Sequence, residues 1–243
     1  MRVKNILIIS DIHLPFQHPQ AFEFLEKVKK DVKPDHVISI GDILDFGSVQ
    51  VSRPSDPNID SPVFELEKAK KEIKTLEKLF PKMQICWGNH DLRLLRKAEL
   101  VGIPRSMIRN INSILEVKAK WSWHDKIIMT MPNGQSVYFT HNFKQNALSS
   151  SKELGCSFVQ GHYHTLGLSI QFWSSPTALN FAMNVGCLIN PKADAFRYQK
   201  NFLKRPILGC AAIIDSSPRL YSMLLNDKGR WVGKIWKQKP KIL

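Results

Sequence analysis

The sequence has little cysteine, and nothing in its spacing would pair or cluster what there is. Cys86, Cys156, Cys187 and Cys210 each lie in or beside an apolar run, and no C-x-x-C pair occurs. Zinc knuckles and disulfide frameworks need clustered or regularly spaced cysteines, so the spacing predicts neither. Buried free thiols are the expected state, which agrees with a reducing compartment.

Long hydrophobic runs, repeats and low-complexity tracts are absent as well. No run approaches the roughly 18 apolar residues of a membrane span, and the N-terminus lacks the apolar core and cleavage site of a secretory signal. These absences predict no membrane partner and a cytoplasmic location. Because no Pro/Gly/Ser-rich linker divides the 243 residues, we expect a single domain over 1–243.

Acidic residues are few relative to basic ones. Lys and Arg number 35 and Asp and Glu number 21, a net charge of +14, and the chain ends in a basic tail at 234–243. Solvated helix surfaces account for such an excess, and so does a polyanionic substrate such as DNA or RNA.

Against this background, three apolar runs that are typical of buried strands end in polar residues. Gly88 lets the backbone turn sharply after the third run, so that the following side chains emerge together. The polar residues are Asp11 and His13 after the run 5–10, Asp42 and Asp45 after 36–40, and Asn89, His90 and Asp91 after 83–87.

The second half of the chain changes to a period of two. Asn133-Gly134 lies between two alternating runs and predicts a hairpin, whose second strand ends at His141. A further strand leads into Gly161-His162-Tyr163-His164. A parallel α/β half followed by a mainly antiparallel β half predicts two stacked sheets flanked by helices.

Helices are predicted between these runs. Ser61 is a suitable N-cap and Pro62 a suitable first residue for one of them. The segment 92–120 has a mixed, basic helical pattern, and we expect a helical cap near the site.

The polar residues collected at the strand ends are Asp11, His13, Asp42, Asn89, His90, His141, His162 and His164. Seven of the eight are oxygen or imidazole ligands in proportions that suit a pair of divalent transition metals with a bridging carboxylate.

The motifs D-x-H, G-D-x-x-D, G-N-H-D, a lone histidine and G-H-x-H occur here in that order, between Asp11 and His164. This arrangement resembles the calcineurin-like metallophosphoesterase family. The resemblance implies an α/β fold, a four-layer α/β/β/α sandwich of two mixed β-sheets flanked by helices. It also implies two divalent metal ions, with manganese favoured over iron, zinc or nickel.

Carried over by position, the resemblance assigns two overlapping ligand sets. Asp11, His13, Asp42 and His164 would hold one metal, and Asp42, Asn89, His141 and His162 would hold the other, with Asp42 as the bridge. The reaction implied is hydrolysis of a phosphate ester by a hydroxide that the two metals activate.

Four further residues receive roles around the metals. His90 would act on the leaving oxygen, and Asp91 would orient His90. Asp45 would hold a ligating histidine through its other ring nitrogen. Arg93 is a candidate for binding substrate phosphate, although a surface arginine at a helix start is an equal interpretation.

Departures from subfamily patterns bear on the substrate. Phosphoprotein phosphatases of this kind have arginine, glutamate and glycine where this sequence has Phe46, Asp91 and Asn142. A phosphodiesterase or nuclease acting on nucleic acid or nucleotides is therefore favoured, because nucleic acid rewards basic residues through counterion release. A phosphomonoesterase of small substrates is the alternative. A non-catalytic protein-binding scaffold is disfavoured because the ligand set is complete. Composition and motifs predict no oligomeric state.

Overall fold

A computed structural model describes residues 3–49, 61–193 and 205–238 of the chain, and its strands form two sheets. The first sheet has the order β12-β11-β10-β1-β2-β3-β4 and the second the order β5-β6-β7-β9-β8. The strands of the first sheet are β1 (Asn5–Ile9), β2 (His36–Ser39), β3 (Lys82–Cys86), β4 (Lys120–His124), β10 (Gly209–Ile214), β11 (Ser217–Ser222) and β12 (Trp236–Gln238). Those of the second are β5 (Ile127–Thr130), β6 (Ser136–Thr140), β7 (Ser157–Gln160), β8 (Ser169–Ser174) and β9 (Leu179–Asn184).

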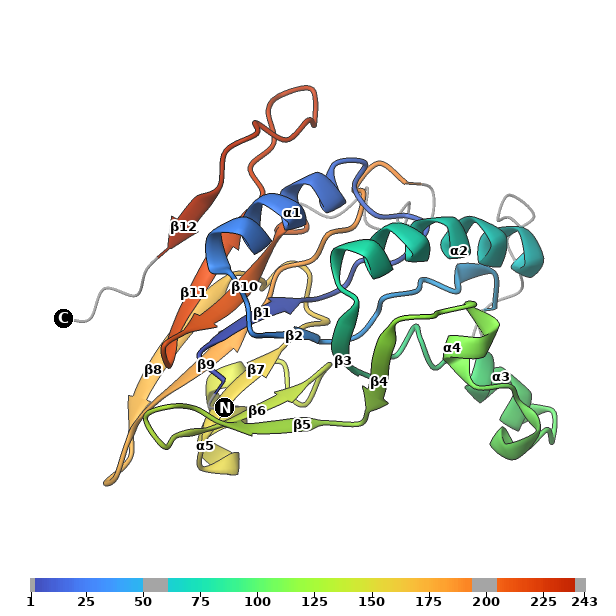
Figure 1. Ribbon diagram of the computed structural model, residues 1–243. Coiled ribbons are helices and arrows are strands. Elements are labelled where there is room, and N and C mark those ends of the chain that lie inside the picture. Colours follow the sequence, from blue (N-terminus) through green and yellow to red (C-terminus); the bar gives the residue numbers. More distant parts are fainter. Residues whose placement is uncertain (1–2, 50–60, 194–204, 239–243) are drawn as a thin grey trace.

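The helices lie on the outer faces of the two sheets. Figure 1 shows α1 and α2 together on one side, α5 on the opposite side, and α3 and α4 beside the β4 end of the first sheet. The helices are α1 (Ala21–Val32), α2 (Pro62–Leu79), α3 (Arg93–Leu100), α4 (Ile111–Ile114) and α5 (Ala147–Leu154), with 3-10 turns η1 (Gly47–Val49) and η2 (Arg105–Met107).

The hydrophobic core follows the alternation of side chains along the central strands. On β1, Leu7 and Ile9 pack on the helical side of the first sheet, whereas Ile6 and Ile8 face the second sheet. Successive side chains of a strand point to opposite faces, so a continuous apolar run fits a sheet that is covered on both sides. A third, smaller cluster around Phe158 lies between the second sheet and α5. Three apolar layers between four structural layers confirm the predicted sandwich of two mixed sheets.

Local signals placed α2 correctly. The Ser61 side chain accepts a hydrogen bond from the Phe64 amide, and Pro62 takes the first helical position. This side-chain oxygen satisfies one of the amide groups that a helix start leaves without a partner in the helix.

Other boundaries differ from expectation. The segment 92–120 holds α3, η2 and α4. Strand β4, which begins at its last residue and was not predicted, has an alternation too short to stand out in the sequence. The edge strand β8 was not predicted either. The basic tail contains β12, which pairs with β11 over Trp236–Gln238, and its last residues, 239–243, lie outside the described part of the chain. No helix within the described ranges combines the length and apolar character needed to cross a bilayer.

Candidate metal centre

The loops after β1 and β2 are joined to each other at one edge of the first sheet. β1 and β2 are parallel neighbours, so their carboxyl ends reach the same edge. The Asp11 amide donates to the Gly41 carbonyl at 3.0 Å, and the His13 amide donates to the Asp42 carbonyl at 3.0 Å. These backbone bonds set the two acidic loops side by side.

Two glycines let further loops approach these carboxylates. A Cβ atom at Gly88 would lie 2.0 Å from Asp42 Oδ1, and one at Gly161 would lie 2.6 Å from Asp11 Oδ2. Real Cβ contacts are far longer, so each position admits no side chain. The glycines of the G-N-H-D and G-H-x-H motifs are therefore what allows the second and third motif loops to close on the first.

One group of metal-binding atoms gathers around Asp11. His164 Nε2 lies 3.0 Å from Asp11 Oδ1, and His13 Nε2 lies 3.8 Å from the same oxygen. The other oxygen, Oδ2, accepts the His162 amide at 3.0 Å and the Ser10 hydroxyl. The arrangement leaves Oδ1 directed at the two imidazoles, the geometry in which one cation can replace the contacts among them.

A second group gathers around Asp42. His141 Nε2 lies 3.2 Å from Asp42 Oδ2, 2.9 Å from Asn89 Oδ1 and 3.1 Å from His162 Nδ1. The structure thus brings together the four residues that the sequence assigned to the second metal.

The two groups meet at Asp42. His13 Nε2 lies 3.7 Å from Asp42 Oδ2, the oxygen that also faces His141. His90 belongs to a third overlapping group, with His13 and Asp42. All eight polar residues that the sequence analysis collected at the strand ends therefore lie close together, and Asp42 lies between the group around Asp11 and the group around His141.

Hydrogen bonds fix which nitrogen of two histidines faces this centre. His13 Nδ1 lies 2.8 Å from Asp45 Oδ1, and His141 Nδ1 lies 2.8 Å from the Ile40 carbonyl oxygen. Because these oxygens accept the Nδ1 proton, each Nε2 is directed at the carboxylates with its lone pair available to a metal.

The backbone of the site is strained. Asp11, His13, Asp42 and His162 have φ values of 50°, 53°, 49° and 67°, in the left-handed region that L-residues rarely adopt. Such conformations cost roughly 1–3 kcal/mol each and persist where the surrounding structure enforces them, commonly at functional sites.

The charge balance of the site fits bound cations. Asp11, Asp42 and Asp45 are each at most 3% exposed. Burial disfavours charged carboxylates, but hydrogen bonds with His13 and His164 outweigh it and hold the pKa of Asp11 well below its usual range. Burial likewise disfavours a charged His13, but the bonds to Asp11 and Asp45 raise the pKa of that imidazole to about 10. Protons on histidines thus compensate buried negative charge that divalent cations compensate better, and a donor set of carboxylate, imidazole and amide groups suits transition metals.

His90 lies at the edge of this set with Asp45 and Arg93. His90 Nδ1 lies 2.9 Å from the Asp45 carbonyl oxygen and 3.1 Å from Asp45 Oδ1. Arg93 Nη1 donates to the same carbonyl at 2.8 Å, and its Nη2 lies 3.1 Å from His90 Nε2. Burial and the nearby His13 lower the pKa of His90. The sequence left Arg93 as either a phosphate-binding residue or a surface arginine, and the structure brings its guanidinium next to His90 and Asp45.

The orienting role expected of Asp91 is wrong. Its carboxylate accepts the backbone amides of Asp42, Gly88 and Leu44 at 2.7, 3.0 and 2.9 Å. Asp91 follows His90 in the sequence but points back under the turn, and Asp45 is the carboxylate that contacts the His90 ring. Asp91 instead ties the G-N-H-D turn to the loop that carries Asp42.

Sequence reasoning missed two supports of the site. Ser10 donates to Asp11, and the Ile40 carbonyl orients His141. The position of Ser10 directly before Asp11 was an available signal for the first contact. The sequence has no signal for the contact between His141 and the Ile40 carbonyl, because every residue carries a backbone carbonyl.

The protein is thus a layered α/β protein whose strand ends carry overlapping clusters of carboxylates and histidines, which are candidate ligands for metal ions. Residues 4–196 match the sequence profile described as calcineurin-like phosphoesterase, so the chain belongs to that family. Among curated proteins no sequence matches it.

Solved structures resemble the chain over nearly its whole length. Vps29 from Chaetomium thermophilum has a TM-score of 0.52 at 10% identity, over 99% of this chain and 97% of that one. The phosphoesterase YfcE from E. coli has a TM-score of 0.48 at 14% identity, over 97% and 98%. The nuclease MPE from Pseudomonas putida has a TM-score of 0.42 at 14% identity, over 96% and 87%. The likeness to Vps29 shows the fold alone.

Proposed function

We propose that the protein is a metal-dependent phosphoesterase that cleaves phosphodiesters of nucleic acid or nucleotides. The observation that carries the proposal is that the candidate ligand groups Asp11-His13-His164 and Asp42-His141-His162 are joined by a third group, His13-Asp42-His90, with the ligand atoms of each group within 4.8 Å of one another. Two adjoining groups that share a bridging acid are the donor pattern of two-metal phosphoester hydrolysis.

The contacts among these residues support the proposed assignment of ligands. Asp11, His13 and His164 would hold one ion, Asn89, His141 and His162 the other, and Asp42 both. When bound, such ions neutralise phosphoryl oxygens and lower the pKa of a shared water. Asp45 and the Ile40 carbonyl keep the ligating nitrogens of His13 and His141 aimed at the ions.

His90 and Arg93 are proposed to act on the substrate. A guanidinium only donates hydrogen bonds, so in the present contact Nε2 of His90 accepts and Nδ1 carries the proton toward Asp45. A substrate phosphate would attract Arg93 and free Nε2 of His90, which would then take up a proton from solvent. The resulting imidazolium would donate that proton to the leaving oxygen and return to its neutral form. Protonation of that oxygen by a positioned histidine is worth typically about 100- to 10,000-fold in rate.

Net charge favours a polyanionic substrate. At +14 the chain attracts phosphate-rich molecules, and nucleic acid binding gains free energy from the counterions that lysine and arginine displace. This is the reason for proposing a diester of nucleic acid or nucleotides over a small monoester.

The first test is hydrolysis of bis-p-nitrophenyl phosphate and p-nitrophenyl phosphate by manganese-loaded protein, repeated with labelled single-stranded and duplex DNA and RNA. Diester turnover with cleavage of nucleic acid is the expected result, and its binding should weaken steeply with salt. Turnover of the monoester alone would indicate a small-molecule phosphatase. An absence of turnover in metal-loaded protein would overturn the proposal and favour a protein-binding scaffold.

A further inference from the structure

A pocket lies next to the metal centre, on the other side of the G-N-H-D turn. It has a volume of about 470 Å³ and lies between β4, α3 and the segment 105–114. Trp87 and Asp91 line it, and between them in the chain lie Asn89, whose Oδ1 is 2.9 Å from His141 Nε2, and His90, which groups with His13 and Asp42. Two residues of extended chain span at most about 7 Å, so a ligand of nucleoside size has the reach to occupy both.

The wall of this pocket on the sheet side is aromatic. Trp87 and Trp123 stack with ring centroids 4.4 Å apart and planes 29° apart, and both are partly exposed. Trp123 Nε1 donates to Asn112 Oδ1 at 2.8 Å, while Asn112 Nδ2 donates to the Trp121 carbonyl at 3.0 Å. The Trp123 ring is therefore held in place with its polar atom occupied and part of its surface against Trp87, and its remaining exposed surface is what a ligand can stack on.

The opposite wall belongs to the helical segment and is apolar. Leu94, Leu95 and Ile108 line it and are only half-buried. None of the residues of α3 is buried. Leu94 packs against the core cluster, whereas the pocket between α3, Ile108 and the two tryptophans stays open and has room for a flat ring. We call this space the slot.

The rim of the slot carries positive charge. Arg105 and Arg109 line the pocket. Arg93, the first residue of α3, lies on the side of the metal centre, where it donates to the Asp45 carbonyl. Arg105 is paired with Glu99, so Arg109 is the rim cation without an ion pair among the described residues. A flat aromatic slot with a cationic rim, beside a phosphate-binding centre, combines the two elements of single-strand nucleic acid recognition, stacking and backbone neutralisation.

We propose that this slot binds the base of a nucleoside phosphodiester next to the metal centre. The inference rests on the proposed phosphoesterase function and deepens it by naming the group that flanks the scissile phosphate. Because recognition is by ring stacking, the slot should accept purines and pyrimidines alike.

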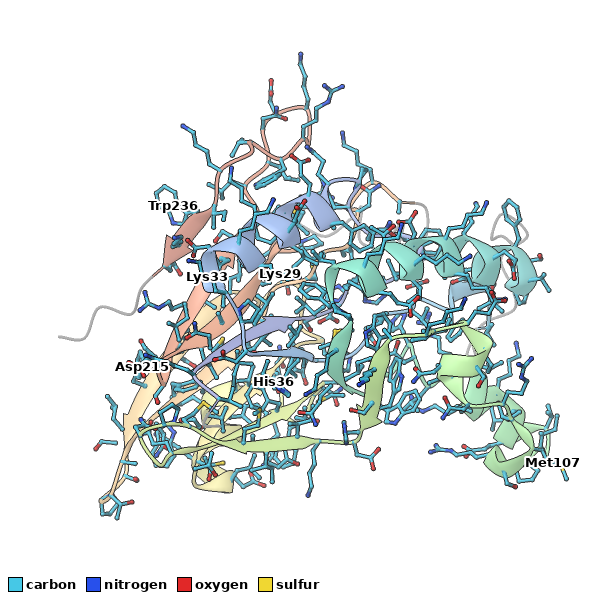
Figure 2. The ribbon with its side chains drawn as sticks, viewed as in Figure 1. Lys29, Lys33, His36, Met107, Asp215 and Trp236 are labelled. Carbon is cyan, nitrogen blue, oxygen red and sulfur yellow. The ribbon has the colours of Figure 1, made fainter. Side chains whose placement is uncertain are left out.

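The test compares two diesters with one leaving group, thymidine 5′-(p-nitrophenyl phosphate) and methyl p-nitrophenyl phosphate, with manganese-loaded protein. Wild-type protein should favour the nucleoside ester in kcat/KM, and Trp123→Ala should reduce that preference about 10- to 100-fold, as expected for loss of one stacking partner. Trp123→Phe should restore most of it. The control is Trp236→Ala, an exposed tryptophan that Figure 2 places at the far end of the molecule from Met107 of η2.

A second variant and a binding measurement keep the outcome clear. Ser106→Trp, at an exposed rim position, fills the mouth of the slot and should reduce the preference even if Trp123→Ala fails to fold. Thymidine 5′-monophosphate should quench tryptophan fluorescence where inorganic phosphate does not.

The two proposals fail differently. Equal hydrolysis of both esters, unchanged by Trp123→Ala and Ser106→Trp, would overturn the slot and leave the phosphoesterase intact. Hydrolysis of neither ester would overturn the phosphoesterase, and the fluorescence titration would still decide the slot: equal responses to the nucleotide and to phosphate refute it.

Discussion

Asp45→Asn is the substitution that best isolates the electrostatic support of the metal centre. His13 Nδ1 and His90 Nδ1 both contact Oδ1 of Asp45, at 2.8 and 3.1 Å. An asparagine with its oxygen at that position retains both contacts and removes the charge. Burial works against the charged carboxylate, yet the bonds with His13 and His90 lower the pKa of Asp45, so the wild-type group is ionised.

The expected magnitude follows from the role of such partners. Changing the group that orients a ligating histidine typically costs about 10- to 100-fold in metal affinity or activity, equivalent to about 1.4–2.8 kcal/mol. The new amide nitrogen would also lie near Arg93 Nη1, 3.9 Å from the present Oδ2. We therefore expect weaker binding of the first metal and slower turnover of bis-p-nitrophenyl phosphate.

Isothermal titration of manganese into metal-stripped protein measures the affinity, and turnover at saturating manganese measures the effect on His90. Asp215→Asn is the matched control: Asp215 is exposed, lies in the β10–β11 hairpin beside the amino end of β1, opposite the end that carries the site, and has a φ of 49° that asparagine tolerates. Wild-type metal affinity in Asp45→Asn would refute the assignment of His13 as a ligand held by Asp45.

Asp42→Asn should abolish turnover and lower the metal content measured by elemental analysis; near-normal activity would contradict a bridging role. His90→Asn should retain both metals and lose about 100- to 10,000-fold in rate, and loss of metal would instead make His90 a ligand. Burial and the nearby Asp42 raise the pKa of Asp91 to about 7, so its bonds are valued as ordinary hydrogen bonds. Asp91→Asn should lower the unfolding temperature by about 1–6 °C, because at least one of its three amide bonds, worth about 0.5–1.5 kcal/mol, is lost. An unchanged melting curve would show that Asp91 does not tie the loops together.

The sequence predicted those parts of the fold that depend on local pattern. The apolar run at β1 and the cap at Ser61 report burial and helix starts within a few residues. Strands β4 and β8 were missed because each lies at the edge of the described strands of its sheet, where one or both faces are exposed and the alternation is weak. Edge strands are defined by their neighbours more than by their own residues.

The sequence by itself determined the donor types and their order along the chain, because carboxylate and imidazole chemistry is carried by residue identity. Tertiary structure decided the partners. Asp45 contacts His90 while the adjacent Asp91 turns away, a choice made by the amides of the Asp42 loop. It likewise placed Trp123 of β4 against Trp87, the residue after β3, since the parallel pairing of β3 with β4 sets their register. Contacts between residues far apart in the chain depend on how strands pair and loops close, and neither is encoded in any single motif.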